Sequence, residues 1–238
     1  MEKIEYPIRV NRYLALKNYC SRREADALIV KKIVTINGKA AVLGDKVNNE
    51  DVVEMSVIKR NEIKTYRYFA YNKPMGIVTH KTEDGQKEIL EAIQLPKDVF
   101  PVGRLDKQSH GLILLTNDGR VNDKLLNPDN DHEKEYMVRV AKPITNIFLK
   151  IMTNGVQLEE FKTKPCKVKK VTENEFRIIL TEGKKHQIRR MCDNIGFGAM
   201  DLRRIRIINI ELGNLGSGHK REILGKELDI FLRSIGIN

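Results

Sequence analysis

Residues 100–119 read FPVGRLDKQSHGLILLTNDG. One acidic residue, Asp106, lies in a loop between Gly103 and Gly111, and an apolar strand is predicted directly after it, at 111–116. Glycine lets a backbone approach a ligand closely, and a strand beside the loop holds the carboxylate in place. From this spacing alone, an aspartate that forms an Asx turn or a cap is the commoner interpretation, and a catalytic aspartate is the alternative.

A second stretch, TEGKKHQIRRMC at 181–192, lies in the most basic part of the chain. Residues 162–206 hold 13 Lys and Arg residues and five Asp and Glu residues, a net charge of +8. If a helix begins at Lys185, its basic side chains occupy two neighbouring faces, Lys185 with Arg189 and His186 with Arg190. Such a face suits phosphate pairing, but a solvated basic helix gives the same pattern.

The remainder of the chain beyond residue 66 predicts a mixture of strands and helices. Strands are expected at 67–71, 111–116, 134–141, 166–171, 175–181 and 203–212. Apolar stripes at helical spacing lie at 147–152 and 188–195. Strands do not alternate regularly with helices, so we expect an α+β fold with a mostly antiparallel mixed sheet flanked by helices rather than a doubly wound parallel sheet.

Residues 1–60 are predicted to form a separate small domain, joined by a linker at 61–66 to a domain at 67–238. Ser21-Arg22-Arg23-Glu24 has the pattern of a capping box, and Asn37-Gly38 is a strong hairpin turn. Basic residues surround the predicted helices, among them Arg9, Arg12, Arg22 and Arg23. Two arginines at a helix N-terminus oppose the helix dipole, which favours a phosphate partner over a merely solvated face.

The composition limits the classes of function. The 238 residues carry a net charge of +11, which points to a polyanionic partner, nucleic acid before an anionic membrane. No apolar run approaches the roughly 18 residues of a membrane span, and no secretory signal is visible. The three cysteines are far apart and the nucleotide-binding motifs are missing, so we expect a cytoplasmic protein without a cofactor.

A metal site is also not expected. Asp131-His132-Glu133-Lys134-Glu135 brings three acids to one histidine, but neighbouring residues on a strand point to opposite faces, so their side chains do not converge.

Two resemblances to known families follow from these motifs. Residues 7–50, with Arg9, Asn11, 20–25 and 34–38, resemble the alpha-L RNA-binding domain. The larger part of the chain, about 66–225, resembles the bacterial ribosomal RNA pseudouridine synthases of the RsuA type. The matching motifs, in family order, are 72–78, 103–106 with 111–119, 134–136 and 183–191. Residues 130–136 and 165–170 are most similar to large-subunit (23S) synthases of the F type.

The resemblance implies an isomerase that detaches the uracil of a uridine within RNA, turns it over and rejoins it through C5 without a cofactor. Asp106 matches the catalytic aspartate; whether it attacks the sugar, adds to the base or removes a sugar proton stays open. Tyr136 matches the tyrosine that stacks on the flipped base, and Arg189 the basic residue that pairs with the aspartate. RNA contacts are implied for Arg104, which fills the gap left by the base, Ile188 in the pocket wall, and Lys185, His186 and Arg190.

The leading hypothesis is therefore a pseudouridine synthase acting on large-subunit ribosomal RNA, with transfer RNA as a further candidate substrate, and we expect a monomer. A non-catalytic RNA-binding factor for ribosome assembly is the alternative. A phosphodiester nuclease is the third hypothesis, but it would ordinarily need clustered acids or paired histidines. His110, larger than usual for its place in the family, is assigned packing or RNA contact.

Overall fold

The computed structural model describes residues 5–17, 19–55, 65–80, 86–96, 98–127 and 130–237. The chain divides into two compact units, one made mainly of Met1–Tyr66 and the other of Arg67–Asn117 with Val121–Asn238. Each unit has an apolar core of its own, and each is described here by itself. Of the predicted linker, 61–66, only the last two residues are among those described.

The first unit packs two helices on short strands. Its elements are β1 (Ile8–Arg9), α1 (Val10–Leu16), α2 (Arg22–Val30), β2 (Val34–Ile36), β3 (Lys39–Ala40), β4 (Lys46–Val47) and β5 (Val53–Met55). Strands β3, β2 and β5 form one small sheet, and β1 pairs with β4. Val10, Leu14, Ala25, Ile29 and Val34 are buried between the helices and the strands.

Both local signals predicted for this unit are confirmed. The Ser21 hydroxyl accepts a hydrogen bond from the Glu24 N–H at 3.3 Å, and the Glu24 carboxylate accepts one from the Ser21 N–H at 2.8 Å. Asn37 and Gly38 both have positive φ angles, 51° and 76°, as the turn between β2 and β3 requires. The start of α2 and the hairpin are therefore set by neighbouring residues.

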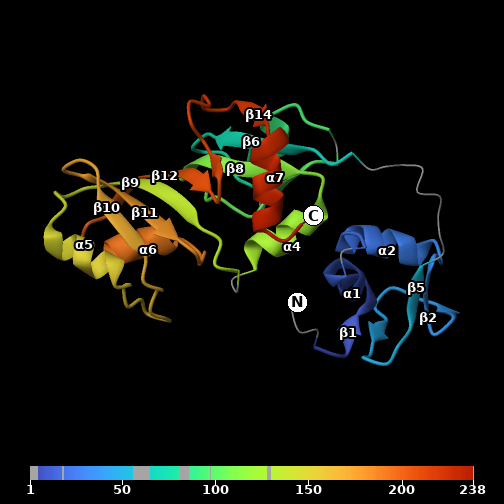
Figure 1. Ribbon diagram of the computed structural model, residues 1–238. Coiled ribbons are helices and arrows are strands. Elements are labelled where there is room, and N and C mark those ends of the chain that lie inside the picture. Colours follow the sequence, from blue (N-terminus) through green and yellow to red (C-terminus); the bar gives the residue numbers. More distant parts are fainter. Residues whose placement is uncertain are drawn as a thin grey trace. The chain divides into compact units, whose positions relative to one another are not determined.

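The second unit is built around one sheet. Its elements are β6 (Tyr68–Lys73), α3 (Ile89–Ala92), β7 (Phe100–Val102), β8 (His110–Thr116), α4 (Gly119–Leu126), β9 (Lys134–Val140), α5 (Asn146–Thr153), β10 (Lys167–Lys170), β11 (Glu175–Leu180), α6 (Gln187–Asn194), β12 (Ala199–Ile207), β13 (Ile210–Glu211), β14 (Lys220–Glu222) and α7 (Gly225–Ser234). Among the described residues, nine strands join in this sheet (Figure 1).

The strand order explains how distant segments meet. The main path runs β10-β11-β9-β12-β8-β6-β14, with β13 paired to β12 and β7 paired to β8. All described pairs are antiparallel except β12 with β8, where Arg203 lies opposite His110 and Arg204 opposite Gly111. The predicted α+β fold with a mostly antiparallel mixed sheet is confirmed, and β12 joins its two halves.

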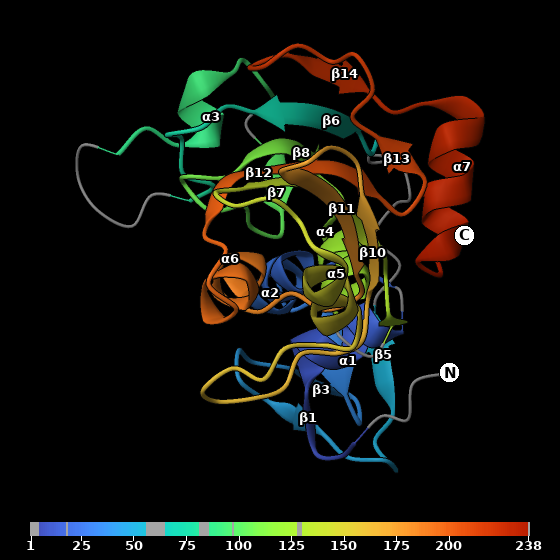
Figure 2. The ribbon, with the colours of Figure 1, turned by 90° about the vertical axis from the view of Figure 1, so that its left-hand side faces the viewer.

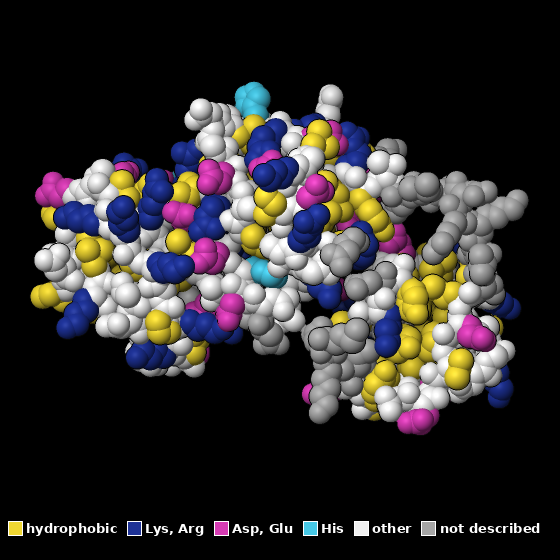
Figure 3. Space-filling model, in the orientation of Figure 1, with side chains coloured by type: hydrophobic (Ala, Val, Ile, Leu, Met, Phe, Trp, Pro, Cys, Tyr) yellow, Lys and Arg dark blue, Asp and Glu magenta, His cyan; other side chains and the backbone are white. Residues whose placement is uncertain are grey.

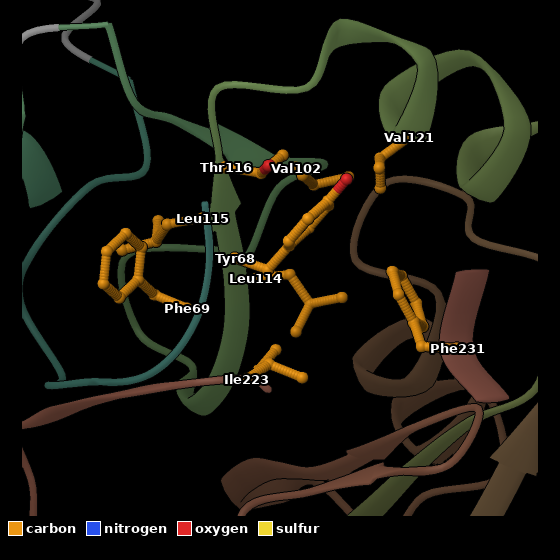
Figure 4. A pocket seen from close by; sticks show the side chains of 9 residues that line it. All are labelled: Tyr68, Phe69, Val102, Leu114, Leu115, Thr116, Val121, Ile223 and Phe231. Atoms are coloured by element: carbon orange, nitrogen blue, oxygen red, sulfur yellow. The ribbon is translucent and has the colours of Figure 1, made fainter. Parts of the chain in front are cut away.

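Helices cover the two ends of this sheet, as Figures 1 and 2 show. Helices α5 and α6 pack on the half of the sheet formed by β10, β11, β9 and β12, where Phe148, Phe176 and Met191 are completely or almost completely buried. Helix α7 lies at the β6–β8 end, where Phe231 faces Tyr68 and Leu114 across a small hollow (Figure 4). The lining of that hollow is almost wholly apolar, so we regard it as core packing.

Two sequence predictions for this unit are wrong in detail. The single strand predicted at 203–212 is two strands, β12 and β13, because Ile208 adopts a positive φ of 52° and reverses the chain. The stripe at 147–152 does form α5, but Ile147 and Ile151 are exposed. Only Phe148 and Met152 of that stripe enter the core, so the buried face of α5 is narrower than its apolar pattern.

None of the described helices is both long and apolar enough to cross a membrane.

Candidate active site

Asp106 lies in the connection between β7 and β8, two antiparallel strands of the sheet centre. The connection turns at Gly103, which has a φ of +72°, and leads into β8, whose second residue, Gly111, has a φ of +101°. The Asp106 side chain is 34% exposed, so its carboxylate is accessible without being fully hydrated. We call residues 103–109, which carry the aspartate that the sequence predicts to be catalytic, the catalytic loop.

Five consecutive carbonyl oxygens of the catalytic loop, from residue 104 to residue 108, each accept a hydrogen bond. The donors come from five places in the chain: Arg204 Nη1 to Arg104 at 3.4 Å, Thr79 Oγ1 to Leu105 at 2.8 Å, Ser109 N to Asp106 at 2.9 Å, Gly76 N to Lys107 at 2.8 Å and Arg189 Nη2 to Gln108 at 2.9 Å. A loop held at these five carbonyls fixes the direction in which the Asp106 side chain leaves the backbone.

Thr79 is attached to the loop by two hydrogen bonds. Its hydroxyl donates to the Leu105 carbonyl at 2.8 Å and accepts from the Leu105 N–H at 3.0 Å. Thr79 is 4% exposed and Leu105 is 7% exposed, so no water replaces either bond readily. One hydroxyl therefore satisfies both backbone groups of the residue that precedes Asp106.

Lys73 supports the turn that presents the Gly76 N–H. Its side chain is completely buried, and Nζ donates to the carbonyls of Pro74 at 2.9 Å and Ile77 at 2.7 Å. Burial lowers the pKa of Lys73 to about 8, although the nearby Asp106 acts in the opposite direction. The buried lysine therefore closes the turn after β6, and the Gly76 N–H of that turn donates to the catalytic loop.

The side chain of His186 contacts the Asp106 carboxylate. Its Nδ1 lies 3.1 Å from Asp106 Oδ2, and the side chain is 45% exposed. His186 has a φ of +51° and directly precedes α6, which brings the ring over the catalytic loop. The sequence predicted an RNA contact for His186 but gave no sign of this pairing.

The predicted ion pair between Arg189 and Asp106 is not formed in this structure. Helix α6 begins at Gln187 and not at Lys185, so Arg189 lies in the first helical turn. From there its guanidinium donates to the carbonyls of Ala199 at 2.8 Å and Gln108 at 2.9 Å. Arg189 thus holds the catalytic loop by its backbone, two residues beyond the carboxylate.

The later start of α6 also corrects the helical faces expected from the sequence. Lys185 is exposed and lies outside the helix, so it does not share a helix face with Arg189. Arg190 pairs with the Glu160 carboxylate and lies 5.7 Å from the centre of the Phe161 ring. Ile188 is 4% exposed and packs in the core of this half of the unit.

Tyr136 lies on β9 at the middle of the sheet. It is opposite Ile178 of β11 on one side and Arg204 of β12 on the other. Its ring is partly buried against the core under α5 and α6. Arg104, in the catalytic loop, is exposed.

Each acidic side chain near His132 forms an ion pair with a lysine or arginine. Asp131 pairs with Lys164 at 2.9 Å, Glu133 with Lys167 at 2.8 Å, and Glu135 with Arg206 at 2.8 Å. Within the described ranges, no three His, Cys, Asp or Glu side chains are grouped so that they could hold a metal ion. These acids serve as partners for the basic strands of the sheet.

His110, at the start of β8, pairs with the Asp201 carboxylate of β12 at 2.9 Å. This is a packing contact between the two central strands, one of the roles expected for it.

Basic side chains of the first unit are exposed on short elements. These are Arg9 of β1, Arg12 of α1, and Arg22 and Arg23 at the start of α2. On the second unit, the face seen in Figure 3 carries many Lys and Arg side chains with acidic side chains among them. Both units can therefore present positive charge to a polyanion.

Comparison with known proteins agrees with this arrangement. A family model described as RNA pseudouridylate synthase matches residues 67–194. The dual-specificity RNA pseudouridine synthase RluF of Escherichia coli (strain K12) is 45% identical over 228 residues, 94% of this chain and 78% of that protein. Ribosomal large subunit pseudouridine synthase B of Bacillus subtilis (strain 168) is 32% identical, over 92% of this chain and 93% of that protein.

A crystal structure of a pseudouridylate synthase has the same fold. It matches with a TM-score of 0.69 at 26% identity, over 96% of this chain and 99% of that one. Together with the loop that carries Asp106 at the centre of the sheet, these matches show that the chain belongs to the RNA pseudouridylate synthase family and isomerises uridine to pseudouridine in RNA.

Proposed function

We propose that this chain modifies a uridine of large-subunit ribosomal RNA and that Asp106 is its catalytic carboxylate. The observation that carries the assignment of Asp106 is the catalytic loop, in which five consecutive carbonyls are held around one half-exposed acid. Preorganisation of this kind is what a reaction at a single carboxylate requires. The large-subunit substrate is supported by the name of the Bacillus subtilis relative.

The proposed roles of the neighbouring residues follow from the chemistry. The target uridine must leave its stack to reach Asp106. Arg104, exposed on the catalytic loop, fills the space that the base leaves, and Tyr136 stacks on the flipped uracil. Ile188 supports the apolar side of the pocket from the core, and Arg189 positions the loop through the Gln108 carbonyl.

RNA affinity is proposed to come from exposed basic residues on both units. On the second unit these are Lys185, His186 and Arg190, of which Arg190 must exchange its Glu160 partner for phosphate. On residues 1–60, proposed as an alpha-L type RNA-binding domain joined by the linker 61–66, they are Arg9, Arg12, Arg22 and Arg23. The reaction is an isomerisation within one RNA chain, so the proposal includes no cofactor, and a monomer in the cytoplasm suffices.

The test is carbodiimide labelling and primer extension on large-subunit ribosomal RNA treated with the protein. One new stop at a single uridine, lost with Asp106→Asn, is the expected result. The same protocol on transfer RNA tests a second substrate, which the name of the dual-specificity relative suggests. If no stop appears on either RNA although binding is tight, the proposed substrates are wrong.

A further inference from the structure

Strand β12 carries two arginines, Arg204 and Arg206, that are mostly withdrawn from solvent but have opposite surroundings. Arg206 donates to the carboxylates of Glu135 at 2.8 Å and Glu133 at 3.0 Å, so its charge is neutralised. Arg204 is 4% exposed and forms no ion pair with any carboxylate of the described residues. Its Nε donates to the Leu112 carbonyl at 2.7 Å, while Nη2 is buried without a partner.

An arginine buried without a carboxylate destabilises the folded protein, because its charge loses water and gains no opposite charge. The backbone around Arg204 is nevertheless tightly constrained. Strand β12 approaches β8 so closely at Gly111 that a Cβ there would lie 2.3 Å from the Arg204 carbonyl oxygen. A glycine with a φ of +101° is therefore required where these two strands meet.

One hydrogen bond, one strand register and one electrostatic effect place Arg204 beside the proposed reaction site. It lies opposite Tyr136 in the register of β12 with β9. Its Nη1 is 3.4 Å from the Arg104 carbonyl of the catalytic loop. Lys73 is within electrostatic range of both Arg204 and Asp106, since Arg204 lowers the pKa of Lys73 and Asp106 raises it.

Lys134 adds to the positive charge at this point. Burial, and then the charge of Arg204, lower the pKa of Lys134 to about 8. Lys73 and Lys134 are thus each within electrostatic range of Arg204, and we call the three side chains the cation cluster. Asp106 is the acid whose negative charge acts on Lys73. Three cations therefore face one carboxylate, and the cluster has an excess of positive charge.

The isomerisation supplies the missing negative charge. When the C1′–N1 bond breaks, its electron pair stays on the uracil. If Asp106 instead adds to C6, the electron pair of the C5–C6 double bond moves towards C4 and onto O4. In each of the three modes left open for Asp106, negative charge therefore develops on the uracil. The C5–C1′ bond then forms, and the bond between Asp106 and the sugar or the base breaks, or the sugar regains the proton that Asp106 removed. C5 loses its proton and N1 gains one, which restores a neutral base.

We propose that the unpartnered Nη2 of Arg204 donates to a carbonyl oxygen of the flipped uracil and stabilises the negative charge that develops on the base. This inference rests on the proposed function, because it takes Asp106 and Tyr136 as the reaction site. A preorganised buried cation accelerates such a step more than a hydrated one would, because it needs no reorganisation as the charge forms. Arg204 is then a catalytic residue, and Arg206, two residues along the same strand, is not.

The test compares single-turnover rates at saturating protein for Arg204→Met, Arg204→Gln and Arg204→Lys, with Arg206→Met as the matched control. We expect Arg204→Met and Arg204→Gln to lower the rate by about 10² to 10³-fold, as loss of one charge-stabilising donor does. Arg204→Lys, which keeps the charge, should lose less. Arg206→Met should stay within about threefold of the parent, because its charge is already paired.

A second readout separates charge stabilisation from damage to the fold. Fluorine at C5 withdraws electrons and makes the uracil anion more stable, so an RNA with 5-fluorouridine at the target depends less on Arg204. The rate at which 5-fluorouridine disappears is measured by mass spectrometry of the digested RNA. The fold-loss of rate caused by substituting Arg204 should be at least tenfold smaller on this RNA than on the uridine RNA. If Arg204→Met does not fold, the comparison of Arg204→Lys with Arg204→Gln on both substrates gives the same information.

Two outcomes overturn the inference: turnover by Arg204→Gln at the parent rate, or a defect equal on uridine and 5-fluorouridine. Either would stand apart from failure of the proposed function, which is shown by Asp106→Asn remaining active.

Discussion

The catalytic loop, 103–109, and helix α2, Arg22–Val30, both carry charged side chains that we propose act on RNA, but they are held in different ways. The loop has no regular structure, and donors from five places in the chain fix its carbonyls. Helix α2 is fixed by its own capping box and by an apolar face, and its Arg22 and Arg23 are exposed. The catalytic loop therefore restrains the position of Asp106, whereas α2 exposes the charges of Arg22 and Arg23 to solvent.

The difference follows from what each task demands. A reacting carboxylate loses much of its effect when it is displaced by about 1 Å. Phosphate binding acts through charge over several ångströms, so flexible arginines suffice. Substitutions in the catalytic loop should therefore alter turnover, whereas substitutions in α2 should alter RNA affinity.

Asp106→Asn should lower turnover by about 10³-fold or more, because an amide neither attacks nor accepts a proton as a carboxylate does. Affinity for RNA should stay within about tenfold, since it comes mainly from phosphate contacts. Single-turnover rates and filter binding with the same RNA measure the two quantities. Loss of affinity in step with turnover would contradict the division.

Thr79→Val should lower turnover by about 10²-fold, because it leaves both backbone groups of Leu105 unpaired and lets Asp106 shift. Thr79→Ser keeps the hydroxyl and should recover most of the rate. Thr163→Val is the matched control, because Thr163 is also buried and accepts from the Val156 N–H at 2.9 Å, away from the catalytic loop. Equal loss of turnover in both valine variants would show that stability, not loop position, is responsible.

The double variant Arg22→Gln, Arg23→Gln should weaken RNA binding by about tenfold and reduce the slope of log affinity against log salt by about 2. The rate at saturating protein should not change. The control removes two exposed charges from α7, Lys226→Gln with Arg233→Gln. If both pairs of substitutions weaken binding equally, net charge alone matters and α2 is not a specific contact.

Ser21→Ala should destabilise α2 by about 1 kcal/mol, because the Glu24 N–H loses its acceptor. Amide hydrogen exchange across 22–30 should become about fivefold faster. Thr145→Ala, which removes the matching cap of α5, should speed exchange in α5 and leave α2 unchanged. Faster exchange in the catalytic loop after Ser21→Ala would argue against the independence of the two regions.

The sequence was sufficient where neighbours along the chain decide the structure. Ser21 and Glu24 are three residues apart, and Asn37-Gly38 encodes its own turn, so both were predicted correctly. The fold class and the position of Asp106 between two glycines were also readable, because the catalytic loop and its strand are consecutive. Boundaries were less certain where one residue changes the backbone, as at Ile208 or at His186 before α6.

Only the tertiary structure decided how the catalytic loop is held and which cation lacks a partner. The donors to the loop carbonyls are distant in sequence: Thr79 is 26 residues from Leu105, Arg189 is 81 from Gln108, and Arg204 is 100 from Arg104. Many side chains can donate to a backbone carbonyl, so such a contact leaves no characteristic residue pattern in the sequence. The sequence by itself determined the local elements and the acid; sheet pairing across β12, which brings distant donors together, determined the site around it.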